Sequence, residues 1–212
     1  MHTIRFRPSG LGGLFAALSI AVASAASAQA GEPAETSFYG IALARPFTGM
    51  PECPKDTNYD NMYVIQANYP CYQHDKISRI GAGLGGDEDL TIMYPSGKYP
   101  EMYNGMYLHV VNGVVQGVKL ITNGVASQTH DFALLVGKFG PPSSRRTIPM
   151  QNRMGATFDV IEASWQRPNG VSMTFKGVVN SLDTGQVNAR TPQEVAREKA
   201  MLDEQQAGVP KL

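Results

Sequence analysis

The fold is decided by residues 106–142, MYLHVVNGVVQGVKLITNGVASQTHDFALLVGKFGPP. Two runs of β-forming residues, 107–111 and 114–122, are separated by Asn112-Gly113. Asn-Gly tolerates the two positive φ angles of a type I′ turn, so the sequence predicts a β-hairpin. One face of the second strand carries more apolar bulk and is expected to line the core: Val114, Gln116, Val118 and Leu120.

The hydrophobic period changes after the hairpin. Four apolar residues follow the i, i+3, i+4, i+7 spacing of one helix face: Phe132, Leu135, Val136 and Phe139. Asn123 or Ser127 can cap the start of this helix, and Gly140 suits its end because glycine adopts a positive φ without strain. Pro141-Pro142 cannot continue a helix. Residues 125–139 are therefore predicted to form an amphipathic helix that packs across the hairpin.

The first 30 residues have the pattern of an export signal. Arg5 and Arg7 precede an apolar run of about 16 residues, 11–26, and Ala28-Gln29-Ala30 supplies the small residues that signal peptidase requires. A bilayer span needs about 20 apolar residues, so the run is too short for an anchor. We expect cleavage after residue 30, no integral membrane segment in the mature protein, and a periplasmic or secreted location in a Gram-negative bacterium.

The charge balance excludes some classes of partner. The chain has 18 basic and 18 acidic residues, and cleavage after residue 30 removes two arginines and no acid. The mature chain then carries 16 basic and 18 acidic residues, a formal charge of −2. Proteins that bind nucleic acid usually carry an excess of basic residues, and this chain has none, so nucleic acid is not expected as a partner.

The chain has two cysteines, Cys53 and Cys71, at a separation of 18 residues. In an oxidising compartment an even count indicates a structural disulfide. A redox thiol is disfavoured because no Cys-x-x-Cys motif is present. The predicted bridge closes a polar loop, residues 54–70.

Residues 81–86, GAGLGG, match the dinucleotide-binding pattern G-x-G-x-x-G. That motif binds a cofactor only between a buried strand and a helix. Here a polar segment precedes it and the strand-like residues 90–94 follow, so we interpret it as a loop and expect no cofactor. The three acids Asp87-Glu88-Asp89 are interpreted as a solvated turn.

The C-terminal half is predicted to end in a helix. Thr191-Pro192-Gln193-Glu194 has the capping threonine, first-turn proline and N3 glutamate of a helix start. The helix extends to about residue 206, and because Val195 and Leu202 are its main apolar residues, it is expected to lie on the surface or to dock onto a partner. Strands are expected at residues 37–43, 157–166, 171–176 and 181–190, and a basic loop at 143–146.

No catalytic motif is recognisable. His74, His109 and His130 have none of the spacings of metal sites, and the chain has no G-x-S-x-G, S-x-x-K or Walker sequence. His130 and Asp131 are adjacent on the predicted helix and point in different directions. Trp165, Arg145 and Arg146 are the candidates for binding a protein partner.

Methionines offer a weak metal hypothesis. Nine of the ten methionines lie beyond the predicted signal, and Met102 and Met106 are spaced i, i+4 with His109 close by. Thioether and imidazole ligands favour Cu(I), so these three residues are the weak candidates for a copper site. Methionine more often fills irregular gaps in a core.

Several short motifs resemble a group of small exported proteobacterial proteins of unassigned function. The similarity covers most of residues 38–192 and is carried by YGIAL at 39–43, PECP at 51–54, LLVGKFGPP at 134–142, the strand pair with Trp165, and LDTGQVN at 182–188. The order of helix, K-F-G-x-P and antiparallel strands is similar to the BamE/SmpA and β-lactamase-inhibitor-protein type of fold. That resemblance implies helices on an antiparallel sheet that binds other proteins, and it carries over no functional residue.

We therefore predict an α+β fold with an antiparallel sheet of five to seven strands, one packed amphipathic helix and a peripheral C-terminal helix. The leading hypothesis is a soluble periplasmic protein-binding or envelope-accessory module without catalytic activity. The alternatives are a periplasmic small-ligand or copper carrier using Met and His side chains, and an enzyme with a dispersed carboxylate or hydroxyl site. The expected organisation is a signal at 1–30, one domain at 31–207 and a tail at 208–212, the domain comprising a disulfide-stapled part at 36–100, a central part at 101–190 and a helix at 191–206.

Overall fold

The computed structural model describes residues 35–56, 62–63, 67–74, 87–151 and 154–207. All of them belong to one compact unit, Pro33–Leu212. The predicted export signal, the glycine-rich segment 81–86 and the tail 208–212 lie outside the described residues.

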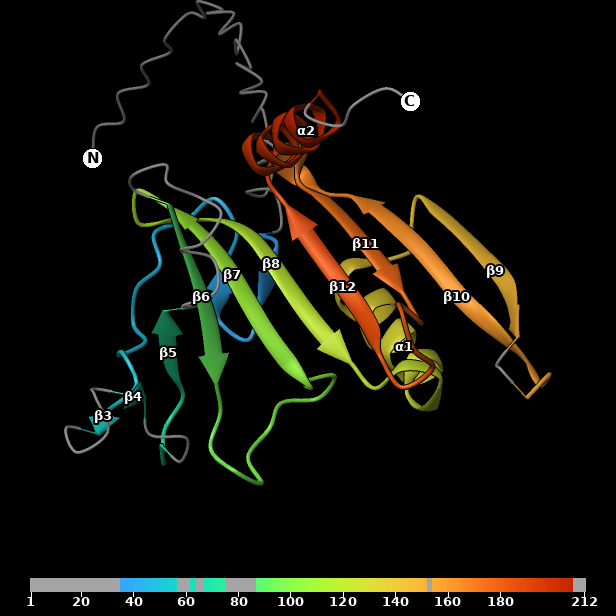
Figure 1. Cartoon of the computed structure of the whole chain (residues 1–212), viewed down its shortest axis with the longest axis horizontal. Coiled ribbons are helices and arrows are strands. Elements are labelled where there is room, and N and C mark those ends of the chain that lie inside the picture. The colour runs from blue at the N-terminus through green and yellow to red at the C-terminus, as the bar shows by residue number, and fades with distance from the viewer. Residues whose placement is uncertain (1–34, 57–61, 64–66, 75–86, 152–153, 208–212) are drawn as a thin grey trace, which may run out of the picture. The chain divides into compact units, whose positions relative to one another are not determined.

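The main sheet has the order β5-β6-β7-β8-β12-β11-β10-β9, and all of its strand pairs are antiparallel. It consists of two runs of sequential neighbours, β5 to β8 and β9 to β12, joined where β8 pairs with β12 (Figure 1). The α+β class is confirmed, and with eight strands in the described residues this sheet exceeds the expected five to seven. The strands are β5 (Cys71–His74), β6 (Asp87–Met93), β7 (Gly105–Val111), β8 (Val114–Thr122), β9 (Ser144–Gln151), β10 (Thr157–Gln166), β11 (Ser172–Lys176) and β12 (Gly185–Arg190), with the short hairpins β1 (Ser37–Phe38), β2 (Ile41–Ala42) and β3 (Lys55–Asp56), β4 (Met62–Tyr63).

The central hairpin is confirmed. Strands β7 and β8 are joined by Asn112 and Gly113, whose φ angles are +50° and +77°. These positive values are those that a type I′ turn requires.

A β-bulge at Gln116 changes which residues of β8 face the core. Gly117 pairs with His109, but the next pair is Val115 with Val110, so Gln116 is one extra residue. The bulge shifts the alternation, and Val115 therefore lies in the core in place of the predicted Val114. Beyond the bulge the prediction holds, because Val118 and Leu120 are buried.

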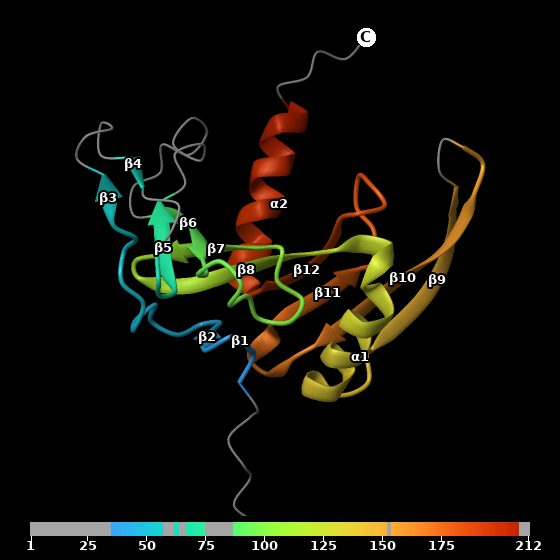
Figure 2. The same cartoon turned by 90° about the horizontal axis from the view of Figure 1, so that it is seen from below.

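The amphipathic helix is α1 (Gln128–Phe139), preceded by a short 3₁₀ helix (Gly124–Ala126). It does not lie across the β7–β8 hairpin as expected, and packs instead on β10 and its neighbours (Figure 2). The ring of Phe132 lies 6.1 Å from that of Trp165 and 6.3 Å from that of Phe175. The Trp165 indole N–H also donates to the carbonyl of Gly140, at 2.9 Å, which fixes the end of the helix against β10.

The N-terminal segment packs against the core beside the hairpin. Phe38, Ile41 and Leu43 are buried, and the chain then pairs with the start of β8 through a hydrogen bond from the Ala44 N–H to the Val115 carbonyl. Residues 37–43 were expected to be one strand but form the hairpin β1–β2. The reason lies at the Tyr39-Gly40 turn, where both residues have a positive φ.

The disulfide prediction is confirmed. Cys53 and Cys71 are bonded, both are buried, and their Cα atoms lie 4.9 Å apart. The bridge fixes the chain before β3 to the edge strand β5, where the Cys53 N–H also donates to the Tyr72 carbonyl. None of the helices in the part of the chain that the structure describes is long and apolar enough to cross a bilayer.

Two segments expected to be loops or turns are strands. Residues 143–146 enter the edge strand β9, because Arg145 and Arg146 pair with Ala163 and Glu162 of β10. The acids at 87–89 begin β6 and pair with the end of β7.

The C-terminal helix is α2 (Pro192–Ala207), and its predicted start is confirmed because the Glu194 N–H donates to the Thr191 hydroxyl. Its only buried residue is Glu194, so the remaining turns of α2 are largely exposed. The expectation of a peripheral helix agrees with this placement.

Candidate binding groove

The sheet face turned away from α1 is called the open face here (Figure 2). Strand register places one residue from each of six neighbouring strands in a single row across it: Thr91, Tyr107, Lys119, Asn188, Thr174 and Ser164. Hydroxyl, amide and amine groups on a sheet face remain hydrated and can form hydrogen bonds with a ligand. The open face is therefore largely polar, and α2 contacts it at β8, at β12 and, through Glu194, at His109 of β7.

A groove of about 620 Å³ lies on the open face over β7, β8 and β12. One end is formed by the first turns of α2, with Glu194, Arg197 and Glu198, and the other by the β11–β12 connection, with Asn180 and Thr184. Figure 2 shows α2 and this connection rising from the same face of the sheet, opposite α1. The floor between them is lined by Tyr107, Lys119, Ile121, Gln186 and Asn188.

His109 and Glu194 anchor α2 to the sheet. The Nδ1 atom of His109 lies 2.8 Å from Oδ1 of Asp89, and its Nε2 atom lies 3.5 Å from Oε2 of Glu194. The side chains of His109 and Glu194 are 9% and 4% exposed, so this contact is nearly dry. The Asp87 carboxylate also lies 4.0 Å from Nε2, which places three acids around one imidazole.

Arg197, three residues farther along α2, forms an ion pair with the Glu194 carboxylate. Its Nε and Nη2 atoms donate to the two carboxylate oxygens, at 2.9 and 2.6 Å. These hydrogen bonds raise the pKa of the Arg197 guanidinium, which favours its charged form. The buried carboxylate is thereby paired, as a charge in a nearly dry site must be.

The backbone of β8 creates the space for this anchor. A Cβ atom at Gly117 would lie 3.3 Å from Cγ of Glu194, so glycine lets the glutamate approach the sheet between β7 and β12. The bulge residue Gln116 holds Thr191, the residue that precedes α2. Its backbone carbonyl accepts from the Thr191 N–H, at 2.9 Å, and its side-chain oxygen accepts from the Thr191 hydroxyl, at 2.6 Å. The bulge thus fixes the direction in which α2 leaves the sheet.

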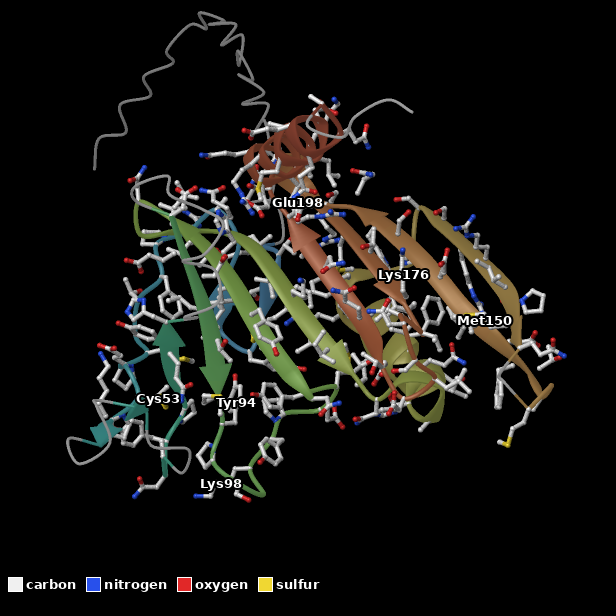
Figure 3. All side chains as sticks on the ribbon, in the orientation of Figure 1. Cys53, Tyr94, Lys98, Met150, Lys176 and Glu198 are labelled. Atoms are coloured by element: carbon white, nitrogen blue, oxygen red, sulfur yellow. A yellow bond between two sulfur atoms is a disulfide. The ribbon has the colours of Figure 1, made fainter. Side chains whose placement is uncertain are left out.

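The remaining charges of the groove differ in how they are satisfied. Arg190 donates through Nη1 to Glu198, but its Nε atom is buried and has no hydrogen-bond partner. Lys119 is exposed on the floor, and no acidic side chain in the described part of the protein forms an ion pair with it. In Figure 3, Glu198 lies at the foot of α2 and Lys176 lies farther along the open face on β11.

The predicted partner-binding residues lie outside the groove. Trp165 is 2% exposed, so as a correction to the sequence analysis it belongs to the core and is not accessible to a partner. Arg145 and Arg146 are exposed on β9, where the first lies over the Phe132 ring at 4.7 Å and the second binds Glu162 through Nε at 2.7 Å.

The weak copper candidates are not brought together. Met106 is fully buried in the core and Met102 packs against it, whereas His109 lines the groove on the opposite face. Within the described ranges, no three His, Cys, Asp or Glu side chains are arranged to hold a metal ion.

The Asp89–His109 pair has the partners of a general base, but its geometry serves another role. The Nε2 atom of His109 is buried, and the nearest acidic oxygen, that of Glu194, comes from α2. A general base must reach the proton of a substrate. In this arrangement the imidazole contacts α2, so the cluster positions the wall of the groove.

Sequence reasoning missed Asp89, Gly117 and Glu194 as parts of one cluster. Extending the predicted strand at 90–94 by three residues would have placed Asp89 opposite His109, as observed. The capping motif located Glu194 at a helix start. The pairing of β8 with β12 brings these elements together, and no local pattern indicates that pairing.

Comparisons with protein-family models, curated proteins and solved structures returned no match. The resemblance to the BamE/SmpA and β-lactamase-inhibitor-protein type of fold therefore stays a prediction from the sequence.

Proposed function

We propose that this protein is an exported, non-catalytic binding module that holds a short segment of another envelope protein in the groove on the open face. The observation that carries this proposal is the groove itself, a hydrophilic floor of about 620 Å³ between two raised elements. Its volume lies within the roughly 300–1,000 Å³ range of small-molecule and cofactor sites.

The dimensions of the groove suit an extended polypeptide. The floor follows β12, which has six residues, and six strand residues span about 20 Å. An extended segment of about six residues has the same length. The amides of Gln186 and Asn188 can pair with peptide N–H and C=O groups, and Tyr107, 40% exposed, offers a flat surface of the kind enriched at protein interfaces.

The envelope location is supported by two features. The first 30 residues have the pattern of an export signal, and the chain beyond them contains the Cys53–Cys71 disulfide, a bond that persists in oxidising compartments. A partner in the same compartment is the simplest source of a polypeptide segment.

Site-specific photo-crosslinking in cells tests the proposal. A benzophenone amino acid replaces Asn188 on the groove floor, and in a matched control it replaces Ala133, an exposed residue of α1 on the other side of the sheet. We expect a discrete crosslinked protein from position 188 and none from position 133, with peptide mapping that places the crosslink on one short segment of the partner. Recovery of the monomer alone from position 188 would reject the proposal.

A further inference from the structure

Three acids and three bases line the groove, so their formal charges are equal in number, but they are not evenly paired. Two arginines are paired with glutamates of α2, Arg190 with Glu198 and Arg197 with Glu194. Asp89 is engaged by His109. Lys119 is then the cation on the floor that forms no ion pair with any acid whose position the structure describes.

A second donor without a partner lies next to this lysine. Arg190 pairs with Gly117 on the neighbouring strand, and Lys119 is two residues farther along β8. Such diagonal neighbours lie about 7–8 Å apart. Position 117 itself contributes no side chain here, and the Glu194 side chain, paired with Arg197, lies over it. The Nε–H of Arg190 is buried and makes no hydrogen bond, so a ligand in the groove senses the guanidinium through its charge, which is shared with Glu198.

Tyr107 and Asn188 frame Lys119 on both sides. Tyr107 pairs with it on β7 and Asn188 pairs with it on β12, so one ammonium, one phenol and one amide share a row. All three groups can donate hydrogen bonds. Three donors in a row, with the Arg190 guanidinium beyond them, form a site for a carboxylate.

We infer that the segment bound in the groove is acidic, with a carboxylate of an aspartate, a glutamate or a chain end placed over Lys119 and directed toward Arg190. This inference rests on the proposed function and specifies the chemistry of the partner. Charge-assisted hydrogen bonds are about twice as strong as neutral ones, so loss of the lysine charge is expected to weaken binding by about tenfold. The attraction is partly exposed and should weaken further as salt is added.

The test uses the full chain, exported and purified from the periplasm with its disulfide formed. A phage library of random dodecapeptides is selected on this protein, and the enriched peptides are synthesised and their affinities measured by titration. We expect enrichment in Asp and Glu, and about tenfold weaker binding to Lys119→Gln. The matched control is Lys176→Gln, which removes an exposed lysine from the same face outside the groove and should leave the affinity unchanged.

The possible results separate the two claims. Enriched peptides without an acidic excess, whose binding is abolished by Asn188→Trp but not by Lys119→Gln, would overturn the acidic segment and leave the groove as the binding site. Failure to obtain any peptide whose binding depends on Asn188 would overturn the proposed function together with this inference. Melting temperatures of the variants within about 2 °C of the unsubstituted protein exclude unfolding as the cause of weaker binding.

Discussion

The anchoring of α2 by Glu194 gives the sharpest prediction about the groove wall. The side chain is 4% exposed, accepts two hydrogen bonds from Arg197 and lies 3.5 Å from His109 Nε2. The substitution Glu194→Gln keeps the shape of the side chain and removes its charge. It leaves the imidazole and the guanidinium facing a neutral amide in a nearly dry site.

The size of the effect follows from these contacts. Hydrogen bonds to charged groups contribute about 1.5–3 kcal/mol, and removing one partner of a buried pair costs about 3–5 kcal/mol. The side chain of Arg197 is 28% exposed, so water recovers part of that loss. We expect the docked first turn of α2 to lose about 2 kcal/mol, which is about a 30-fold rise in its opening equilibrium.

Amide hydrogen exchange measures that opening directly. The N–H groups of Glu194 and Val195 donate to Thr191, so their protection reports whether the first turn is docked. The matched control is Asp203→Asn, which removes an exposed acid paired with Lys199 on the same helix and should change exchange by less than about threefold. Exchange at residues 194–195 that rises no more in Glu194→Gln than in the control would refute the proposed anchor.

Three further predictions concern the sheet, the disulfide and Tyr103, which lies in the connection between β6 and β7 and donates through its hydroxyl to the Ile92 carbonyl, at 2.7 Å. Gly117→Ala places a methyl group about 3.3 Å from the Glu194 side chain and is expected to speed exchange at the start of α2 by about fivefold; unchanged exchange would contradict the close approach. The double substitution Cys53→Ser and Cys71→Ser is expected to lower the free energy of unfolding by about 3 kcal/mol in urea titrations, since the bridge closes a loop of 18 residues, and a loss below about 1 kcal/mol would contradict that role. Burial raises the pKa of Tyr103 from 10.0 to about 12. The contribution of its phenol to stability is therefore fully present below pH 10 and is lost as pH rises toward 12. In urea titrations between about pH 9 and 12, the free energy of unfolding should fall less steeply with pH in Tyr103→Phe than in the unsubstituted protein, and identical slopes would contradict the raised pKa.

Local patterns in the sequence predict the elements of this fold well. Asn112-Gly113 gives the hairpin, the spacing from Phe132 to Phe139 gives α1, and Thr191 with Glu194 gives the start of α2. Each depends on residues close together in the chain, where turn geometry and helix capping act directly.

The errors arise where long-range contacts decide the outcome. Because of the bulge at Gln116, Val115 lies in the core where Val114 was predicted. The Gln116 side chain is hydrogen-bonded to Thr191, which is 75 positions away in the chain. The helix α1 packs on β10 because Trp165, rather than the hairpin, supplies its partner surface.

The candidate site depends on one such contact above all. Pairing of β8 with β12 brings Lys119 beside Asn188, and it places Gly117 where Glu194 can approach His109. The residue types of the site are ordinary in the sequence. These residues form a site because of the order of the strands in the sheet, and local patterns in one sequence do not predict that order.

The most direct test of the account is amide chemical-shift mapping of the ¹⁵N-labelled protein with the partner segment identified by crosslinking from position 188. We predict that the largest shifts fall on Tyr107, Lys119, Gln186 and Asn188, with smaller changes at the first turn of α2. Shifts confined to β9 and β10, or to the loop between β6 and β7, with the groove unchanged, would contradict it.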